Sequence, residues 1–165
     1  MRLMLTALLL ALPACSPAAS PGARDSAPEA ADEVAGAARH PESGLPVIDL
    51  VVTGVSGEHR FRVEVARSSS EQARGLMFRT AMGPDEGMIF PMEPPRFASF
   101  WMKNTVIPLD LIFIGPDGRI LNIAPNARPY AEDRLVSAGP VRGVLELAGG
   151  RAAALGIAPG DSVKW

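Results

Sequence analysis

The stretch LDLIFI at residues 109–114 predicts a β-strand that is apolar on both faces except at Asp110. Two leucines and Phe113 alternate onto one face, while Asp110 shares the other face with two isoleucines. A carboxylate in this position is at least partly buried, and a buried charge without a partner is unfavourable. We therefore expect a cation close to Asp110.

Other short apolar runs lie on both sides of this stretch, separated by Gly and Pro. The run at 59–65 alternates strictly between apolar and charged residues, which is typical of a half-exposed strand. The remaining strand candidates are residues 47–52, 87–90, 97–102, 119–123, 144–147 and 162–165. A Pro-Asp-Gly turn at 116–118 joins 109–114 to the run at 119–123 as a hairpin.

Two short helices complete the predicted elements. Ser68 and Glu71 have the spacing of a capping box, which starts a helix that ends between Gly75 and Arg79. A second, alanine-rich helix follows 149–150 and ends at Gly156, where a left-handed C-cap is expected. These elements predict an α+β domain, mainly antiparallel β, that forms a small partly closed barrel with two short helices.

A group of polar residues beside the apolar strands forms the candidate site. We expect 97–103 and 109–115 to pair as a hairpin, which would bring Lys103 or Asn104 close to Asp110. The alternative cation is Arg79, whose guanidinium group suits a carboxylate. Two further candidates are Trp101, as a stacking wall, and Glu146, as a second buried carboxylate. The residues alone leave open whether this group lines a pocket or forms a structural ion pair.

The chain has 165 residues, one Cys and two His, so it has room for one domain and cannot form an internal disulfide. Its formal net charge of −2 comes from outside residues 45–165, which hold 13 positive and 13 negative side chains. This balance argues against nucleic acid as a partner and against docking on anionic lipid. No cofactor motif is found, and we expect neither a cofactor nor a metal site.

The N-terminal segment is predicted to be an export signal. Arg2 precedes an apolar run at 3–12 that is too short to span a bilayer, which is typical of a secretory signal peptide at 1–15. The end of the run, 12–15 (LPAC), resembles the lipobox of bacterial lipoproteins, which implies a lipid on Cys15. The alternative is cleavage further along the chain, with Cys15 discarded. Residues 16–44 are rich in Ala, Pro and Ser and predict a flexible tether before a globular domain at 45–165.

These N-terminal features predict an exported protein on the periplasmic side of a bacterial membrane. Its contact with the membrane would be the lipid anchor on Cys15. Ser16 after the Cys, rather than Asp, favours the outer membrane if the cell has one.

Several short motifs together resemble the domain-of-unknown-function 192 family of small prokaryotic proteins. They span about 60–165 and comprise 75–79 (GLMFR), 87–90 (GMIF), 100–105 (FWMKNT), 107–110 (IPLD), 144–146 (VLE) and 160–161 (GD). The resemblance implies a compact, mainly β fold that is often exported. It implies no reaction, because the activity of the family is unsettled.

Two classes of function remain after these observations. The first is an envelope-tethered binding module for a glycan, a small polar molecule or an envelope protein, with Trp101, Arg79 and the polar residues around Asp110 as the contacts. The second is a hydrolase of envelope glycan that uses Asp110 and Glu146 as an acid/base pair. The sequence favours binding, because a few convergent polar groups suffice for recognition.

Overall fold

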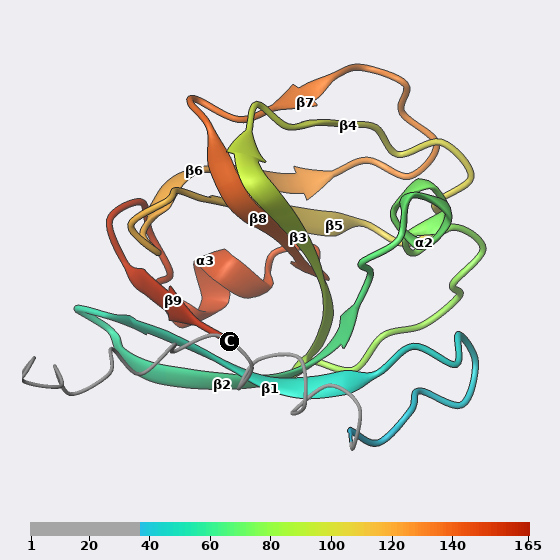
Figure 1. Cartoon of the computed structure of the whole chain (residues 1–165), viewed down its shortest axis with the longest axis horizontal. Coiled ribbons are helices and arrows are strands. Elements are labelled where there is room, and N and C mark those ends of the chain that lie inside the picture. Colours follow the sequence, from blue (N-terminus) through green and yellow to red (C-terminus); the bar gives the residue numbers. More distant parts are fainter. Residues whose placement is uncertain (1–36) are drawn as a thin grey trace, which may run out of the picture.

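The computed structural model describes residues 37–165, which form nine strands and two short helices (Figure 1). The strands are β1 (Val47–Gly54), β2 (Gly57–Val65), β3 (Glu86–Arg96), β4 (Ser99–Phe100), β5 (Leu109–Ile114), β6 (Ile120–Ala127), β7 (Leu135–Val136), β8 (Val141–Ala148) and β9 (Ser162–Lys164). The helices are α2 (Ser69–Arg74) and α3 (Arg151–Leu155). The predicted α+β class with mainly antiparallel strands is confirmed.

Seven strands form one strongly curved sheet in the order β6-β5-β8-β3-β2-β1-β9, and β4 pairs with β7 in a small second sheet. Only β2 and β3 run parallel within the large sheet. The barrel does not close. Its two edges meet at a bridge between Arg119 and Ser162. Three backbone bonds support this contact: the Val163 amide donates to the Gly118 carbonyl at 2.7 Å, the Ile120 amide to the Asp161 carbonyl at 2.9 Å, and the Gly160 amide to the Ile120 carbonyl at 2.8 Å.

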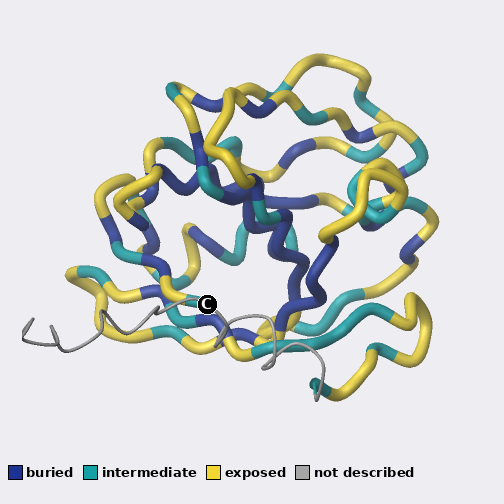
Figure 2. Tube along the Cα trace, in the orientation of Figure 1, coloured by how far each residue is buried: buried dark blue, intermediate teal, exposed yellow. Residues whose placement is uncertain are grey.

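The large sheet carries a hydrophobic core on each of its faces. One core fills the inside of the curve, where side chains of β1, β2, β5 and β8 pack with Ala152 of α3 and Ile157. This is the inner core. The other, outer core lies between the opposite face of the sheet and the segment that holds α2, β4 and β7. Every residue of β5 is buried, and the deepest part of the molecule follows β3, β5 and β8 (Figure 2). A strand that is apolar on both faces therefore lies between two cores.

Local sequence signals place both helices as expected. Ser68 accepts a bond from the Glu71 amide at 3.2 Å, and the Glu71 carboxylate accepts from the Ser68 amide at 2.8 Å, which completes the capping box. The helix α3 ends at Gly156, whose left-handed φ of 67° allows its amide to bond back to the last turn.

One predicted pairing is wrong. Residues 97–103 do not form a hairpin with β5; instead β4 pairs with β7, and β5 lies between β6 and β8. The segment 101–108 contains no strand, and Asn104 adopts a left-handed φ of 56°. This turn directs 100–105 over the outer core, so that Lys103 does not approach the β5 face that holds Asp110.

Three prolines lie within β3, which extends to Arg96, whereas the expected strand ended at residue 90. Beyond Ile89 the strand no longer pairs with β2, and its register with β8 is interrupted between Pro91 and Arg96. Proline cannot donate to a ladder bond, so it is tolerated where the neighbouring strand is absent. This end of β3, beyond its pairing with β2, borders the cleft described below.

Residues 37–46 lie against the sheet. The Val47 amide bonds to the Ala38 carbonyl at 2.7 Å, and Arg39 bridges to Pro46. Residues 38–44, which we assigned to the tether, therefore contact the domain. Signal peptide, Cys15 and most of the tether lie outside the described residues. Within 37–165, no helix is both long and apolar enough to cross a bilayer.

Candidate functional site

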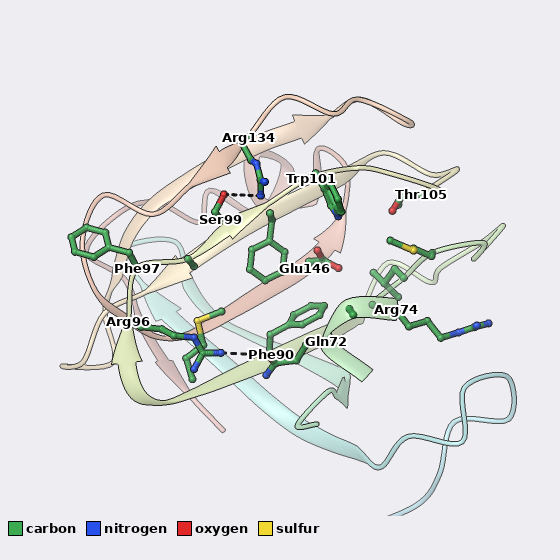
Figure 3. A pocket seen from close by; sticks show the side chains of 17 residues that line it. Gln72, Arg74, Phe90, Arg96, Phe97, Ser99, Trp101, Thr105, Arg134 and Glu146 are labelled. Atoms are coloured by element: carbon green, nitrogen blue, oxygen red, sulfur yellow. Dashed lines mark hydrogen bonds between the residues drawn. The ribbon is translucent and has the colours of Figure 1, made fainter. Parts of the chain in front are cut away.

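A cleft of about 510 Å³ opens on the outer core, between α2, the proline-rich end of β3 and the segment 97–101 (Figure 3). Its walls combine aromatic, thioether and polar side chains. The lining residues are Gln72, Ala73, Arg74, Gly75, Leu76, Met77, Phe90, Met92, Arg96, Phe97, Ala98, Ser99, Phe100, Trp101, Thr105, Arg134 and Glu146. The volume falls in the range of sites that hold small molecules.

Glu146 supplies the only carboxylate among these lining residues and lies deep in the cleft (Figure 3). The register of β8 places it beside Met88 of β3 and Leu111 of β5, both fully buried. The residue is 5% exposed. Among residues 37–165 no hydrogen bond or ion pair reaches its carboxyl, whose oxygens remain accessible from the cleft. The group is therefore available to a bound molecule.

Burial changes the protonation of this group. Removal from water disfavours the charged form and raises the pKa of Glu146 to about 8. At pH 7 the carboxyl is therefore mostly protonated and can both donate and accept a hydrogen bond. A neutral acid in the cleft is suited to a polar group of a ligand.

Aromatic rings form the wall next to Glu146. Phe100 packs edge to face against Phe90, with ring centroids 5.1 Å apart, and against Phe113 at 6.4 Å. Trp101 stands at the rim with 41% of its surface exposed. Two cations, Lys103 and Arg134, each lie 5.2 Å from the centre of its ring. The wall is thus apolar inside and cationic at the edge.

Three arginines line the cleft, and they come from different elements. Arg96 and Arg134 approach the opening from opposite sides, whereas Arg74 extends outward from α2 (Figure 3). Arg96 donates to Gln72 at 3.4 Å and Arg134 donates to Ser99 at 3.4 Å. Both bonds are long, and no carboxylate in the described part of the chain pairs with any of the three guanidinium groups.

Two of the six side chains predicted for the site, Trp101 and Glu146, line this cleft. Lys103 lies next to it, over the Trp101 ring. Asn104 forms the nearby turn, where its carbonyl accepts from the Phe78 amide at 2.9 Å and its side-chain amide lies 3.9 Å from Met77 Sδ. The remaining two, Asp110 and Arg79, have other partners.

Among residues 37–165 no cation pairs with Asp110, contrary to our expectation, and Asp110 is 0% exposed. Its Oδ1 accepts bonds from the amides of Asn126 at 2.7 Å and Gly150 at 2.9 Å, and its Oδ2 accepts from the Ala152 amide at 2.8 Å. Backbone amides at the start of α3 therefore stabilise the carboxylate in place of a side-chain cation.

The two carboxylates of the predicted acid/base pair lie on opposite faces of the sheet. In the β5–β8 register Asp110 is opposite Leu147, while Glu146 is opposite Leu111. Leu147 belongs to the inner core and Leu111 to the outer one. The sheet itself separates the groups, so they cannot act on one bond.

Arg79 pairs with other carboxylates. It contacts Glu64 of β2 at 2.9 Å and Glu42 at 3.1 Å, and its side chain is almost fully buried. The Ser43 hydroxyl also bonds to Glu64. This cluster joins residues 40–43 to β2, and Arg79 is not among the residues that line the cleft. Within residues 37–165, no three acidic, His or Cys side chains gather as a metal site would require.

The sequence model of DUF192, described as "Uncharacterized ACR", matches residues 51–165, which is most of the described domain. The chain belongs to the DUF192 family. No curated protein matches the chain at a significant level.

Two solved structures resemble this DUF192 domain. A protein of unknown function from Novosphingobium aromaticivorans DSM 12444 is 60% identical, with a TM-score of 0.78, over 82% of this chain and 96% of that one. A Sinorhizobium meliloti 1021 protein, proposed to be a transcription regulator, is 40% identical, with a TM-score of 0.70, over 73% of this chain and 94% of that one.

Much of the cleft in this DUF192 domain could not be found from local sequence patterns. Phe90, Arg96 and Arg134 belong to three separate segments, and none stands out where it occurs. The one available signal was a charge within an apolar strand, which pointed to Glu146 and to Asp110 alike. The strand register then places one of them in the cleft and the other against backbone amides.

Proposed function

We propose that this DUF192 domain is a binding module whose cleft takes a small molecule. The observation that carries the proposal is the carboxyl of Glu146, which lies deep in the cleft without a hydrogen-bond partner among residues 37–165. The oxygens of this carboxyl are accessible from the cleft, so a ligand that enters it can bond to them directly.

The size and chemistry of the cleft support one ligand class among those considered from the sequence. A volume of about 510 Å³ holds a single ring with its substituents, whereas a protein partner or a long glycan needs a more extended surface. Hydrolysis by Asp110 and Glu146 lacks support, because the sheet separates the two groups. A transcription-regulator role is not proposed, since residues 45–165 carry no surplus of positive charge.

A blocked cleft tests this proposal. Ala73 is exposed on α2 and lines the cleft, so Ala73→Trp fills the opening without disturbing a core. The matched control is Ala153→Trp, at an exposed alanine of α3 on the other side of the sheet. We expect ligand-observed NMR with a library of small fragments to give compounds that bind the wild-type chain and Ala153→Trp but not Ala73→Trp.

Two results would contradict the proposal. One is a library that gives no bound fragment at all. The other is a set of bound fragments that Ala73→Trp and Ala153→Trp retain equally, because the compounds would then bind elsewhere on the domain.

We further propose that the domain is exported and held at the periplasmic side of a membrane through lipid on Cys15. Cys15→Ser should move the protein from the membrane fraction to the soluble fraction, because this is the only cysteine available for the lipid. Fractionation of cells that express each form measures the change. A Cys15→Ser protein that stays with the membrane would overturn this assignment, and Ser16→Ala serves as the neighbouring control.

A further inference from the structure

The charges of the cleft indicate which kind of ligand it selects. Its charged lining residues are three arginines and Glu146. Burial raises the pKa of Glu146 to about 8, so that at pH 7 this carboxyl adds little negative charge. The lining is therefore strongly positive, although residues 45–165 as a whole are balanced.

The arginines are free to bind an anion. In the described part of the chain none forms an ion pair, and the bonds of Arg96 and Arg134 to neutral side chains are 3.4 Å long. The acidic residues nearest to them in sequence do not line the cleft; these are Glu71, Glu93, Glu132 and Asp133. Guanidinium groups bind carboxylates through two parallel bonds, and binding is strongest where the groups are not already neutralised.

The distribution of groups gives the ligand an orientation. Arg96 and Arg134 lie on opposite sides of the cleft, with Glu146 between them (Figure 3). The packed rings of Phe90 and Phe100 also line the cleft, and Glu146 is buried beside them. We propose that the cleft selects an organic carboxylate with an apolar ring, its anionic group between Arg96 and Arg134 and an uncharged polar group on the carboxyl of Glu146. This inference rests on the proposed function and adds the chemical class of the ligand.

Three related compounds test each part of this arrangement. The probe is 3-(4-hydroxyphenyl)propionate, which has a carboxylate, a ring and a hydroxyl group in line. Its amide, 3-(4-hydroxyphenyl)propanamide, lacks the charge, and 3-phenylpropionate lacks the hydroxyl. We expect titration calorimetry at pH 7 and low salt to show binding of the probe, with the amide about tenfold weaker and 3-phenylpropionate several-fold weaker.

Variants of the protein locate the charge effect. Arg96→Met and Arg134→Met should each weaken binding of the carboxylate several-fold and leave the weaker binding of the amide unchanged. Arg128 is exposed and outside the cleft, so Arg128→Met is the matched control and should bind the carboxylate normally. High salt should reduce the preference for the carboxylate, because the arginines are accessible to solvent ions.

The failures of the two proposals can be distinguished. Equal affinity for carboxylate and amide, or a preference for neutral or cationic fragments in the cleft, would overturn the selection of anions while the binding function stands. Loss of carboxylate binding in Arg128→Met as much as in Arg96→Met would also overturn it. Absence of any fragment that Ala73→Trp displaces would instead remove the binding function itself.

Discussion

Glu146→Gln is expected to raise the melting temperature by about 10–15 °C at pH 8 and to leave it nearly unchanged at pH 4.5. Glutamine has the shape of a protonated glutamic acid and cannot ionise. The difference between the variant and the wild-type chain therefore isolates the free energy that one buried ionisation costs the folded state.

The direction follows from the raised pKa. Burial raises the pKa of Glu146 to about 8 in the folded state, from the ordinary value of 4.5. Between these two values the folded protein retains a proton that the unfolded chain has lost, so stability decreases as the pH rises. Each pH unit contributes about 1.4 kcal/mol, which gives a total of about 4–5 kcal/mol at pH 8. Below pH 4.5 both states hold the proton and the effect disappears.

Thermal unfolding followed by circular dichroism from pH 4.5 to 8.5 measures this effect. Because the two curves are subtracted, groups that titrate in both proteins cancel. Glu132 is exposed, and Glu132→Gln is the control that should follow the wild-type chain at every pH. A variant Glu146→Gln that melts below the wild-type chain at pH 8, or a constant difference at all pH values, would contradict the buried ionisation.

Asp110→Asn is expected to lower stability by about 3 kcal/mol, and Asp110→Ala by more. The carboxylate is 0% exposed and accepts three backbone amide bonds, from Asn126, Gly150 and Ala152. Asparagine replaces one oxygen with a donor, which then faces an amide that is itself a donor. The start of α3 and the end of β6 would lose the acceptor that joins them to β5.

Urea unfolding measures this loss, with Asp117→Asn as the control. Asp117 accepts only one amide bond, from Arg119 at 3.0 Å in an exposed turn, and its substitution should cost under about 1 kcal/mol. Asp110→Asn should bind cleft ligands as the wild-type chain does wherever it is folded, because it lies on the other face. Lost binding with unchanged stability would contradict the structural role and return Asp110 to the site.

Local patterns in the sequence predicted where strands and helices form better than they predicted which strands pair with each other. The capping box of Ser68 and the alternation at 59–65 depend on residues close in sequence, and both are found in the structure except that Glu64 of that strand is buried. In contrast, β5 pairs with β8, which begins more than 25 residues further along the chain, and no local sequence pattern specifies that pairing. The predicted hairpin between 97–103 and 109–115 was wrong for this reason.

The same distinction explains the candidate site. A buried carboxylate was recognisable at both Asp110 and Glu146, but the groups around each come from distant segments. For Asp110 they are backbone amides, which every residue type supplies, so no side chain could reveal them. For Glu146 they are aromatic and arginine side chains that meet only after β3 and β8 pair.

The contact between the two edges of the large sheet affects how readily the protein can associate with other copies at high concentration. Unpaired edge strands present backbone donors and acceptors to which a second chain can add, and this is a common start of aggregation. Here the edge strand β9 is three residues long, and the bridge from Arg119 to Ser162 engages part of both edges. Asn122 also bonds to the backbone of 136–138, which covers part of β6. These contacts occupy part of the two edges to which a second chain could otherwise add.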